Sequence, residues 1–222
     1  MSTLRKLLFI FLVLVIFGVG GYAQTEFEEQ RRLARQGNAQ AQAYIGYSYS
    51  KGRGVPRDYK EAFKWYRKAA NQGHAFAQFM VGEAYRDGEG VRKDFQETVK
   101  WYRKAAEQSF AKAQFNLGYM YAKGQGVPKD DKESFKWYRK AAEQGYASAQ
   151  NNLGLHYYNG QGVLRDYVLA HMWINLAHSN STYENDRKQS TNLLNDLERK
   201  MTPKQLFEAQ KLSREWKPTV RF

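Results

Sequence analysis

Four tryptophans recur at one fixed interval, and this interval constrains the fold more than any other feature of the chain. Trp65, Trp101, Trp137 and Trp173 stand 36 residues apart each time. The segment FKWYRKAA around the first returns as VKWYRKAA and again as FKWYRKAA, and a more divergent copy, HMWINLAH, surrounds the fourth. A constant period of this length is typical of stacked structural repeats. We therefore expect an array of one repeated unit, in which each copy contacts mainly its neighbours.

The first half of each repeat has the pattern of a helix, expected over 39–50 in the first copy. Alanine, an aliphatic residue and tyrosine recur there at four-residue spacing, which places Ala41, Ile45 and Tyr49 on one helical face. A glycine stands in the middle of this helix in every copy, Gly46 in the first, although it costs about 1 kcal/mol relative to alanine. Its recurrence indicates close approach of a second helix, and we expect the tryptophan of that helix to fill the space.

The connection between the two helices reads G-x-G-V-x-x-D in every copy. Its glycines suit the left-handed backbone that follows a helix end. Asp58 is expected to cap the second helix, and Glu61 to form a capping-box-like pair with it. A glycine-rich loop before a helix also occurs in phosphate sites, but no Lys-Ser/Thr pair completes a P-loop. Repetition in every unit favours a structural turn.

The repeat pattern resembles a known family. Residues 37 to about 180 follow A-x-A-Q-x-x-L-G-x-x-Y-x-x-G-x-G-V-x-x-D-x-x-x-A-x-x-W-Y-x-x-A-A, which resembles the Sel-one-like repeat (SLR) family, relatives of tetratricopeptide repeats. The resemblance implies an all-α fold, an α/α superhelical solenoid of helix-turn-helix repeats that serves as a scaffold for protein–protein contacts, commonly in the bacterial envelope. Some cysteine-rich members are linked to β-lactam binding or hydrolysis, but this chain has no cysteine, so that activity is not carried over.

The first 23 residues have the layout of a secretory signal peptide. Two basic residues precede an apolar run from Leu7 to Val19, and the small residues Gly21 and Ala23 suit a cleavage site. We expect cleavage after Ala23 and a periplasmic or secreted protein. The alternative is an uncleaved leader that anchors the chain in the inner membrane.

A change in the fourth repeat predicts a C-terminal cap. Its second helix carries Met172 and Leu176 where the first three copies carry lysines, so this face is expected to be covered. Two segments can cover it, 183–199 with three leucines and 203–216 with Leu206, Phe207, Ala209 and Leu212. Thr202 and Pro203 suit the start of the latter helix.

The predicted segments are a signal peptide at 1–23, an N-terminal capping helix at 24–36, repeats at 37–72, 73–108, 109–144 and 145–180, and capping helices within 181–222.

Motifs for catalysis are missing from the sequence. It contains no nucleotide fingerprint, no Gly-x-Ser-x-Gly element and no nucleophile with a nearby base. Its histidines are expected to be structural or on the surface: His74, His156, His171 and His178. We therefore expect no enzymatic activity, no cofactor and no metal.

Binding surfaces are better supported, and the first of two candidates is the variable part of the first helices. In this class of repeat these helices line the concave face, so variation there can encode a ligand on a fixed scaffold. Filling of gaps between repeats is the alternative role for the bulky residues. The predicted concave binding face consists of Tyr44, Tyr47, Phe79, Met80, Glu83, Phe115, Asn116, Tyr119, Asn151, Asn152 and His156.

The second candidate is a basic stripe on the second helices. The chain has a formal net charge of +13, and nine of its cations recur at equivalent positions: Lys64, Arg67, Lys68, Lys100, Arg103, Lys104, Lys136, Arg139 and Lys140. Such a stripe would suit anionic lipid or envelope glycan, whereas export makes nucleic acid a poor candidate. A glutamate three residues before the first lysine of each set also fits an ordinary solvated face.

These observations predict an exported, non-enzymatic, monomeric scaffold that binds a protein or peptide in the cell envelope. The alternative is an enzyme or binder that acts on cell-wall material or β-lactam-like ligands.

Overall fold

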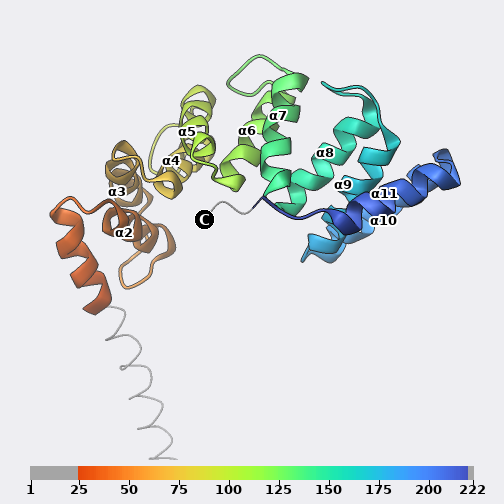
Figure 1. Ribbon diagram of the computed structural model, residues 1–222. Helices are drawn as coiled ribbons and strands as arrows, with labels where there is room; N and C mark the ends of the chain where they lie inside the picture. The colour runs from red at the N-terminus through yellow and green to blue at the C-terminus, as the bar shows by residue number, and fades with distance from the viewer. Residues whose placement is uncertain (1–24, 220–222) are drawn as a thin grey trace, which may run out of the picture. The chain divides into compact units, whose positions relative to one another are not determined.

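The computed structural model describes residues 25–219, which form two compact units, one ending at Asp94 and one beginning at Phe95 (Figure 1). All regular secondary structure in this range is α-helical, which confirms the predicted all-α fold of helix-pair repeats. None of its helices is long and apolar enough to span a bilayer. The predicted signal peptide and its cleavage site lie outside the described residues.

The first unit contains a helix at 25–35 followed by α2 (Ala39–Lys51), α3 (Tyr59–Asn71) and α4 (Ala75–Asp87). Helix α3 packs against both α2 and α4. Phe27 of the leading helix is buried in one cluster with Ile45 of α2. The leading helix therefore covers the first repeat.

The second unit contains seven helices: the second helix of the second repeat, two complete helix pairs and two further helices. They are α5 (Phe95–Glu107), α6 (Ala111–Lys123), α7 (Asp131–Glu143), α8 (Ala147–Asn159), α9 (Tyr167–Asn180), α10 (Glu184–Lys200) and α11 (Pro203–Glu215). From α5 to α9 each helix packs on the next, whereas α10 and α11 both pack on α9 (Figure 1). This unit thus stacks helix pairs in the manner of a solenoid and ends them with two covering helices.

Helices α3, α7 and α9 begin at the predicted aspartate caps, but α3 lacks the predicted capping box. The Oδ1 atom of Asp58 accepts hydrogen bonds from the backbone N–H groups of Lys60 and Glu61 at 2.8 and 3.0 Å. The backbone N–H of Asp58 is already bonded to the carbonyl of Tyr49 at 3.0 Å, so it is not available to Glu61. The Glu61 carboxylate instead pairs with Lys64 at 2.6 Å, and the capping-box prediction is wrong for this helix.

The mid-helix glycine makes room for a tyrosine, not for the tryptophan that we expected. A Cβ atom on Gly46 would lie 2.7 Å from Cδ1 of Tyr66, inside van der Waals contact. The same relationship joins Gly118 to Tyr138 and Gly154 to Ile174. The residue after the tryptophan therefore faces the glycine. One step along a helix turns the side-chain direction by about 100°, so the tryptophan itself points elsewhere.

A buried glutamine ties each first helix to the repeat before it, a role that the sequence analysis did not assign. The Nε2 atom of Gln42 donates to the carbonyl of Ala34 at 3.1 Å, and its Oε1 accepts from Gln72 at 2.7 Å. The second unit repeats these contacts at Gln114 with Ala106 and Gln144, and at Gln150 with Ala142 and Asn180. Each glutamine thus adds a second hydrogen bond to a carbonyl near the end of the preceding helix, which already accepts one from the backbone N–H three residues on.

The two C-terminal helices cover the apolar face of α9. Leu197 of α10 and Ala209 of α11 are fully buried. Helix α11 begins at Pro203, and Thr202 before it is the N-cap and forms a capping box with Gln205. Phe207, which we expected in the covering face, is instead 63% exposed.

Candidate functional site: a polar pocket in the second unit

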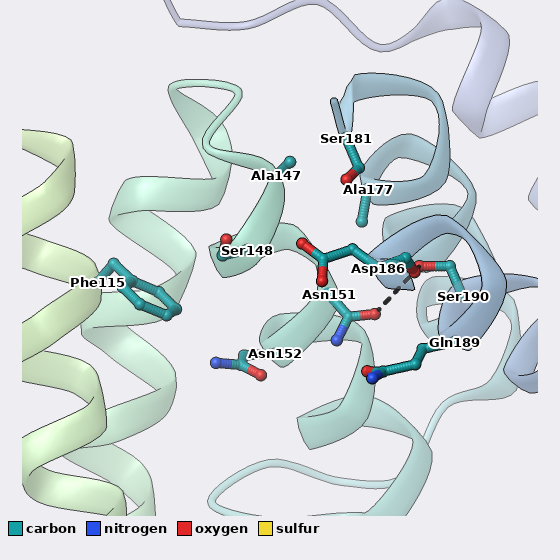
Figure 2. A pocket seen from close by; sticks show the side chains of 10 residues that line it. All are labelled: Phe115, Ala147, Ser148, Asn151, Asn152, Ala177, Ser181, Asp186, Gln189 and Ser190. Atoms are coloured by element: carbon teal, nitrogen blue, oxygen red, sulfur yellow. Dashed lines mark hydrogen bonds between the residues drawn. The ribbon is translucent and has the colours of Figure 1, made fainter. Parts of the chain in front are cut away.

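A pocket of about 160 Å³ lies among α6, α8, the end of α9 and the first turns of α10 (Figure 2). Three residues of the predicted concave face line it, namely Phe115, Asn151 and Asn152. Its other lining residues are Ala147, Ser148, Ala177, Ser181, Asp186, Gln189 and Ser190. The structure therefore brings part of the predicted face together with α10.

Two flanking residues direct the asparagines of α8 toward the pocket. Gln150 and Leu153 are fully buried, and the period of the helix leaves Asn151 and Asn152 on a less buried side. Both asparagines are half-buried. Their amides therefore lie where a ligand in the pocket can reach them.

Phe115 forms the aromatic wall of the pocket. Its ring lies 5.6 Å from the ring of Tyr138 and 5.3 Å from that of Tyr146, measured between centroids. Such distances are within the range of favourable aromatic pairs. The two tyrosines therefore hold the phenylalanine in place.

Helix α10 supplies three polar residues that the sequence analysis did not place in a site. Asp186, Gln189 and Ser190 share one helical face, because their spacing is i, i+3 and i+4. The Ser190 hydroxyl donates to the backbone carbonyl of Asp186 at 3.0 Å and lies 3.5 Å from Oδ1 of Asn151 (Figure 2). The spacing of these polar residues was the available signal, but we interpreted the segment only as a cap.

Two residues of the predicted concave face are buried and offer no surface to a ligand. Phe79 is 2% exposed and His156 is 5% exposed. Both therefore fill the interior, which was the alternative role for bulky residues at these positions. For these two residues the prediction of a binding role is corrected.

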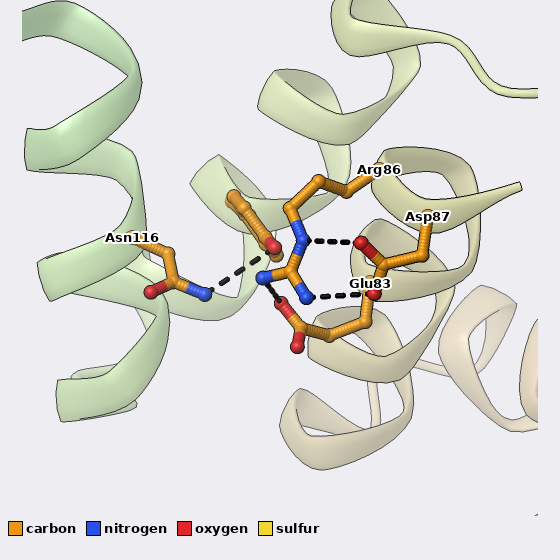
Figure 3. Close-up of polar contacts among 5 residues, drawn as sticks. Glu83, Arg86, Asp87 and Asn116 are labelled. Carbon is orange, nitrogen blue, oxygen red and sulfur yellow. Dashed lines mark hydrogen bonds and ion pairs between the residues drawn. The ribbon is translucent and has the colours of Figure 1, made fainter. Parts of the chain in front are cut away.

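Two polar members of the predicted face are engaged within their own units (Figure 3). In the first unit, Arg86 donates to Glu83 at 2.7 Å and makes two bonds to Asp87 at 2.8 and 2.7 Å. In the second unit, Asn116 donates to the hydroxyl of Tyr102 at 3.3 Å. A ligand would have to compete with these bonds.

The remaining members of the predicted face lie at the surface outside this pocket. Tyr44, Tyr47 and Met80 are half-buried, and Tyr119 is exposed. A lysine or arginine of the same unit stands 5.9 Å from two of these rings: Arg53 at Tyr47 and Lys123 at Tyr119.

The structure brings one hydroxyl next to a histidine, which the sequence analysis did not foresee. The Oγ atom of Ser134 lies 3.3 Å from Nε2 of His156, whose Nδ1 lies 2.6 Å from the carbonyl oxygen of Gln161. The ring packs between Phe135 and Tyr138, and burial lowers the pKa of His156. Because both partners are buried, the pair anchors the loop after α8 and does not face a substrate.

Each set of cations in the predicted basic stripe has local partners. In α3, Lys64 pairs with Glu61, and Lys68 Nζ lies 4.2 Å from the centre of the Trp65 ring. The same two contacts recur in α5 and α7, at Lys100 with Glu97, Lys104 with Trp101, Lys136 with Glu133 and Lys140 with Trp137. The arginines contact Tyr85, Tyr121 and Glu143. One lysine of each set therefore covers a face of the tryptophan on its own helix, at Trp65, Trp101 and Trp137.

Within residues 25–219, no group of three or more His, Asp or Glu side chains could hold a metal ion. The pocket instead presents hydroxyls, side-chain amides, one carboxylate and one aromatic ring. These groups suit reversible hydrogen bonding and apolar contact.

Comparisons with a family model and with solved structures point to the same family. The model of the Sel1 repeat matches residues 39–74, 75–110, 111–146 and 147–177, so its repeats begin two residues later than those we predicted. A Sel1 repeat protein from Oxalobacter formigenes is 35% identical over 89% of this chain and 84% of its own, with a TM-score of 0.71. A protective antigen of uropathogenic Escherichia coli with an SLR fold is 34% identical over 84% of this chain and 47% of its own, with a TM-score of 0.55. A comparison with curated proteins gave no match.

Proposed function

Because the chain belongs to the Sel1 repeat family, whose members generally mediate protein–protein interactions, we propose that it is a non-enzymatic scaffold that binds a peptide segment of a partner protein. The bound segment lies in the pocket between α8 and α10. The observation that carries this proposal is the convergence of the amides of Asn151, Asn152 and Gln189 beside the ring of Phe115.

The chemistry of these groups suits an extended peptide. A side-chain amide offers both N–H donors and a carbonyl acceptor, and can therefore bond to the N–H and C=O of a peptide backbone. Phe115 adds apolar area that can cover a neighbouring side chain. Such contacts recognise a chain in extended form, because its backbone groups are not already paired as they are in a helix.

We further propose that the partner resides in the cell envelope. The support is the amino-terminal sequence, in which two basic residues, an apolar run and the small residues before position 24 follow the layout of a secretory signal. Anionic lipid or glycan is a less favoured partner, because the lysines of the basic stripe already contact glutamates and tryptophans.

Selection from a random nine-residue peptide library against the purified protein tests the binding function. We expect a shared sequence motif among the selected peptides, and at least a tenfold weaker affinity for the variant Asn151→Ala/Asn152→Ala in calorimetric titration. Asn192→Ala is the matched control, since Asn192 is exposed on α10 and does not line the pocket. Failure to select any motif, or equal affinity for the double variant and the parent, would contradict the proposal.

A further inference from the structure

The pocket contains a single charged lining residue, and that residue is acidic. The chain as a whole has a formal net charge of +13, yet Asp186 is the one ionisable side chain that lines this pocket. Figure 2 shows its carboxylate reaching from α10 toward Ser148 and Asn151 of α8. The local charge of the pocket is thus opposite to that of the protein.

The carboxylate of Asp186 has no ion-pair or side-chain hydrogen-bond partner among residues 25–219. Asp196, on the same helix, is different, because it accepts bonds from Lys200 at 2.7 Å and from Tyr158. Only the backbone carbonyl of Asp186 is engaged, by Ser190. A carboxylate that faces a pocket without a partner is available to a ligand.

The size and walls of the pocket indicate what kind of group enters it. Its volume of about 160 Å³ is below the roughly 300–1,000 Å³ of pockets that enclose whole drug-sized ligands. It therefore fits a single side chain. The aromatic ring of Phe115 can accept the apolar stem of a long side chain, or a cation against its face.

We infer that this pocket selects a lysine or arginine side chain of the bound segment, with Asp186 pairing its charge and Phe115 contacting its stem. The inference rests on the proposed function and specifies the class of peptide that the scaffold takes. Removal of the carboxylate charge should then weaken the binding of only those peptides that carry the basic residue.

A double-mutant cycle on one selected peptide tests the inference. The basic residue of the peptide is replaced by norleucine, which keeps the stem and removes the charge, and Asp186→Asn removes the opposite charge with little change of shape. We expect the basic peptide to bind the parent at least tenfold more tightly than the norleucine peptide, and we expect Asp186→Asn to abolish that difference. Glu184→Gln is the control, since Glu184 is in the same first turn of α10 but does not line the pocket.

Selected motifs without a basic residue, or basic and norleucine peptides of equal affinity, would overturn the inference while leaving peptide binding intact. A similar loss of preference in Glu184→Gln would also overturn it, because the effect would then come from the general charge of the helix start. A failure of the proposed function has a different signature, namely no selected motif or no effect of Asn151→Ala/Asn152→Ala.

Discussion

Trp173 of α9 and Trp216, the residue after α11, meet edge to face, with ring centroids 5.9 Å apart and ring planes at 72°. In the three preceding repeats the equivalent tryptophan has a lysine against its face at 4.2 Å. Leu176 occupies the place of that lysine in the fourth repeat. The C-terminal segment therefore replaces the lysine as the cover of the last tryptophan.

Trp216→Ala should destabilise the second unit by about 2 kcal/mol, because it removes an aromatic pair and part of the apolar cover of α9. Urea unfolding followed by circular dichroism measures the change. Phe207→Ala is the control, since this ring is exposed on α11, and its effect should stay within about 0.5 kcal/mol. Equal effects of the two substitutions would show that Trp216 does not hold the cap.

Ser109→Gly should stabilise the protein by about 1 kcal/mol. Ser109 has a φ of +65° at a position where the other repeats have glycine, and this conformation costs a non-glycine residue about 1–2 kcal/mol. The reverse substitution, Gly73→Ser, should cost a similar amount, since its φ is +90° and a Cβ there would meet nothing within 4 Å. Thermal and urea unfolding of both variants measure the two changes in stability. Changes of the same sign would contradict this prediction.

Gly126→Ala should be more damaging than Gly124→Ala, although both residues have positive φ. A Cβ on Gly126 would lie 2.1 Å from the carbonyl oxygen of Phe95, whereas one on Gly124 would come no closer than 3.3 Å, to the backbone of Lys129. We expect Gly124→Ala to lower the free energy of unfolding by about 1–2 kcal/mol, because of its backbone conformation. Gly126→Ala should lower it by about 1–3 kcal/mol more, because of overpacking. Equal losses in urea unfolding would mean that the close approach of the loop is not required.

The repeat architecture could be predicted from the sequence because the same local signals recur in every copy. The fixed tryptophan interval, the glycines after the first helix and the Asp58 cap each have a local cause, and the structure contains the corresponding helices. Which residue faces the mid-helix glycine could not be predicted, because that depends on how the second helix is rotated. Trp65 and Tyr66 are adjacent in sequence, and only packing decides between them.

The candidate site was less predictable, since four of its ten lining residues come from a non-repeating segment. Asn151 and Asn152 were found because they vary at a fixed position of the repeat. Asp186 and Gln189 lie in the capping helix, for which no second copy exists to compare. Their place in the pocket depends on how α10 packs on α9, a contact between segments that no local pattern specifies.

Stability should fall as the pH is lowered below neutral. Burial lowers the pKa of His74, His156 and His171 from the ordinary value of 6.5. As the pH falls through 6.5, the unfolded chain therefore binds protons that the folded chain does not, and the free energy of unfolding decreases until the lowered pKa values are passed. The decrease should be visible in urea unfolding between pH 7.5 and pH 5.

His171 offers a specific test of this pH dependence. Its ring is buried with no hydrogen bond to either nitrogen among the described residues, and Glu198 of α10 lies 3.6 Å from Nε2. His171→Leu should therefore reduce the loss of stability between pH 7.5 and pH 5. An undiminished loss in this variant would contradict a role for His171 in the pH dependence.

The central claim, that a peptide segment occupies the pocket between α8 and α10, is tested most directly by site-specific photocrosslinking. A photoreactive phenylalanine is placed at Ser148, which is exposed at the pocket and is not one of the three amides, or at Leu164, which is 89% exposed in the loop after α8 and does not line the pocket. Each protein is irradiated with a selected peptide and analysed by mass spectrometry. We predict a covalent adduct from position 148 that an excess of unlabelled peptide suppresses, and little adduct from position 164. Equal adducts from both positions, or an adduct at 148 that unlabelled peptide does not suppress, would contradict the claim.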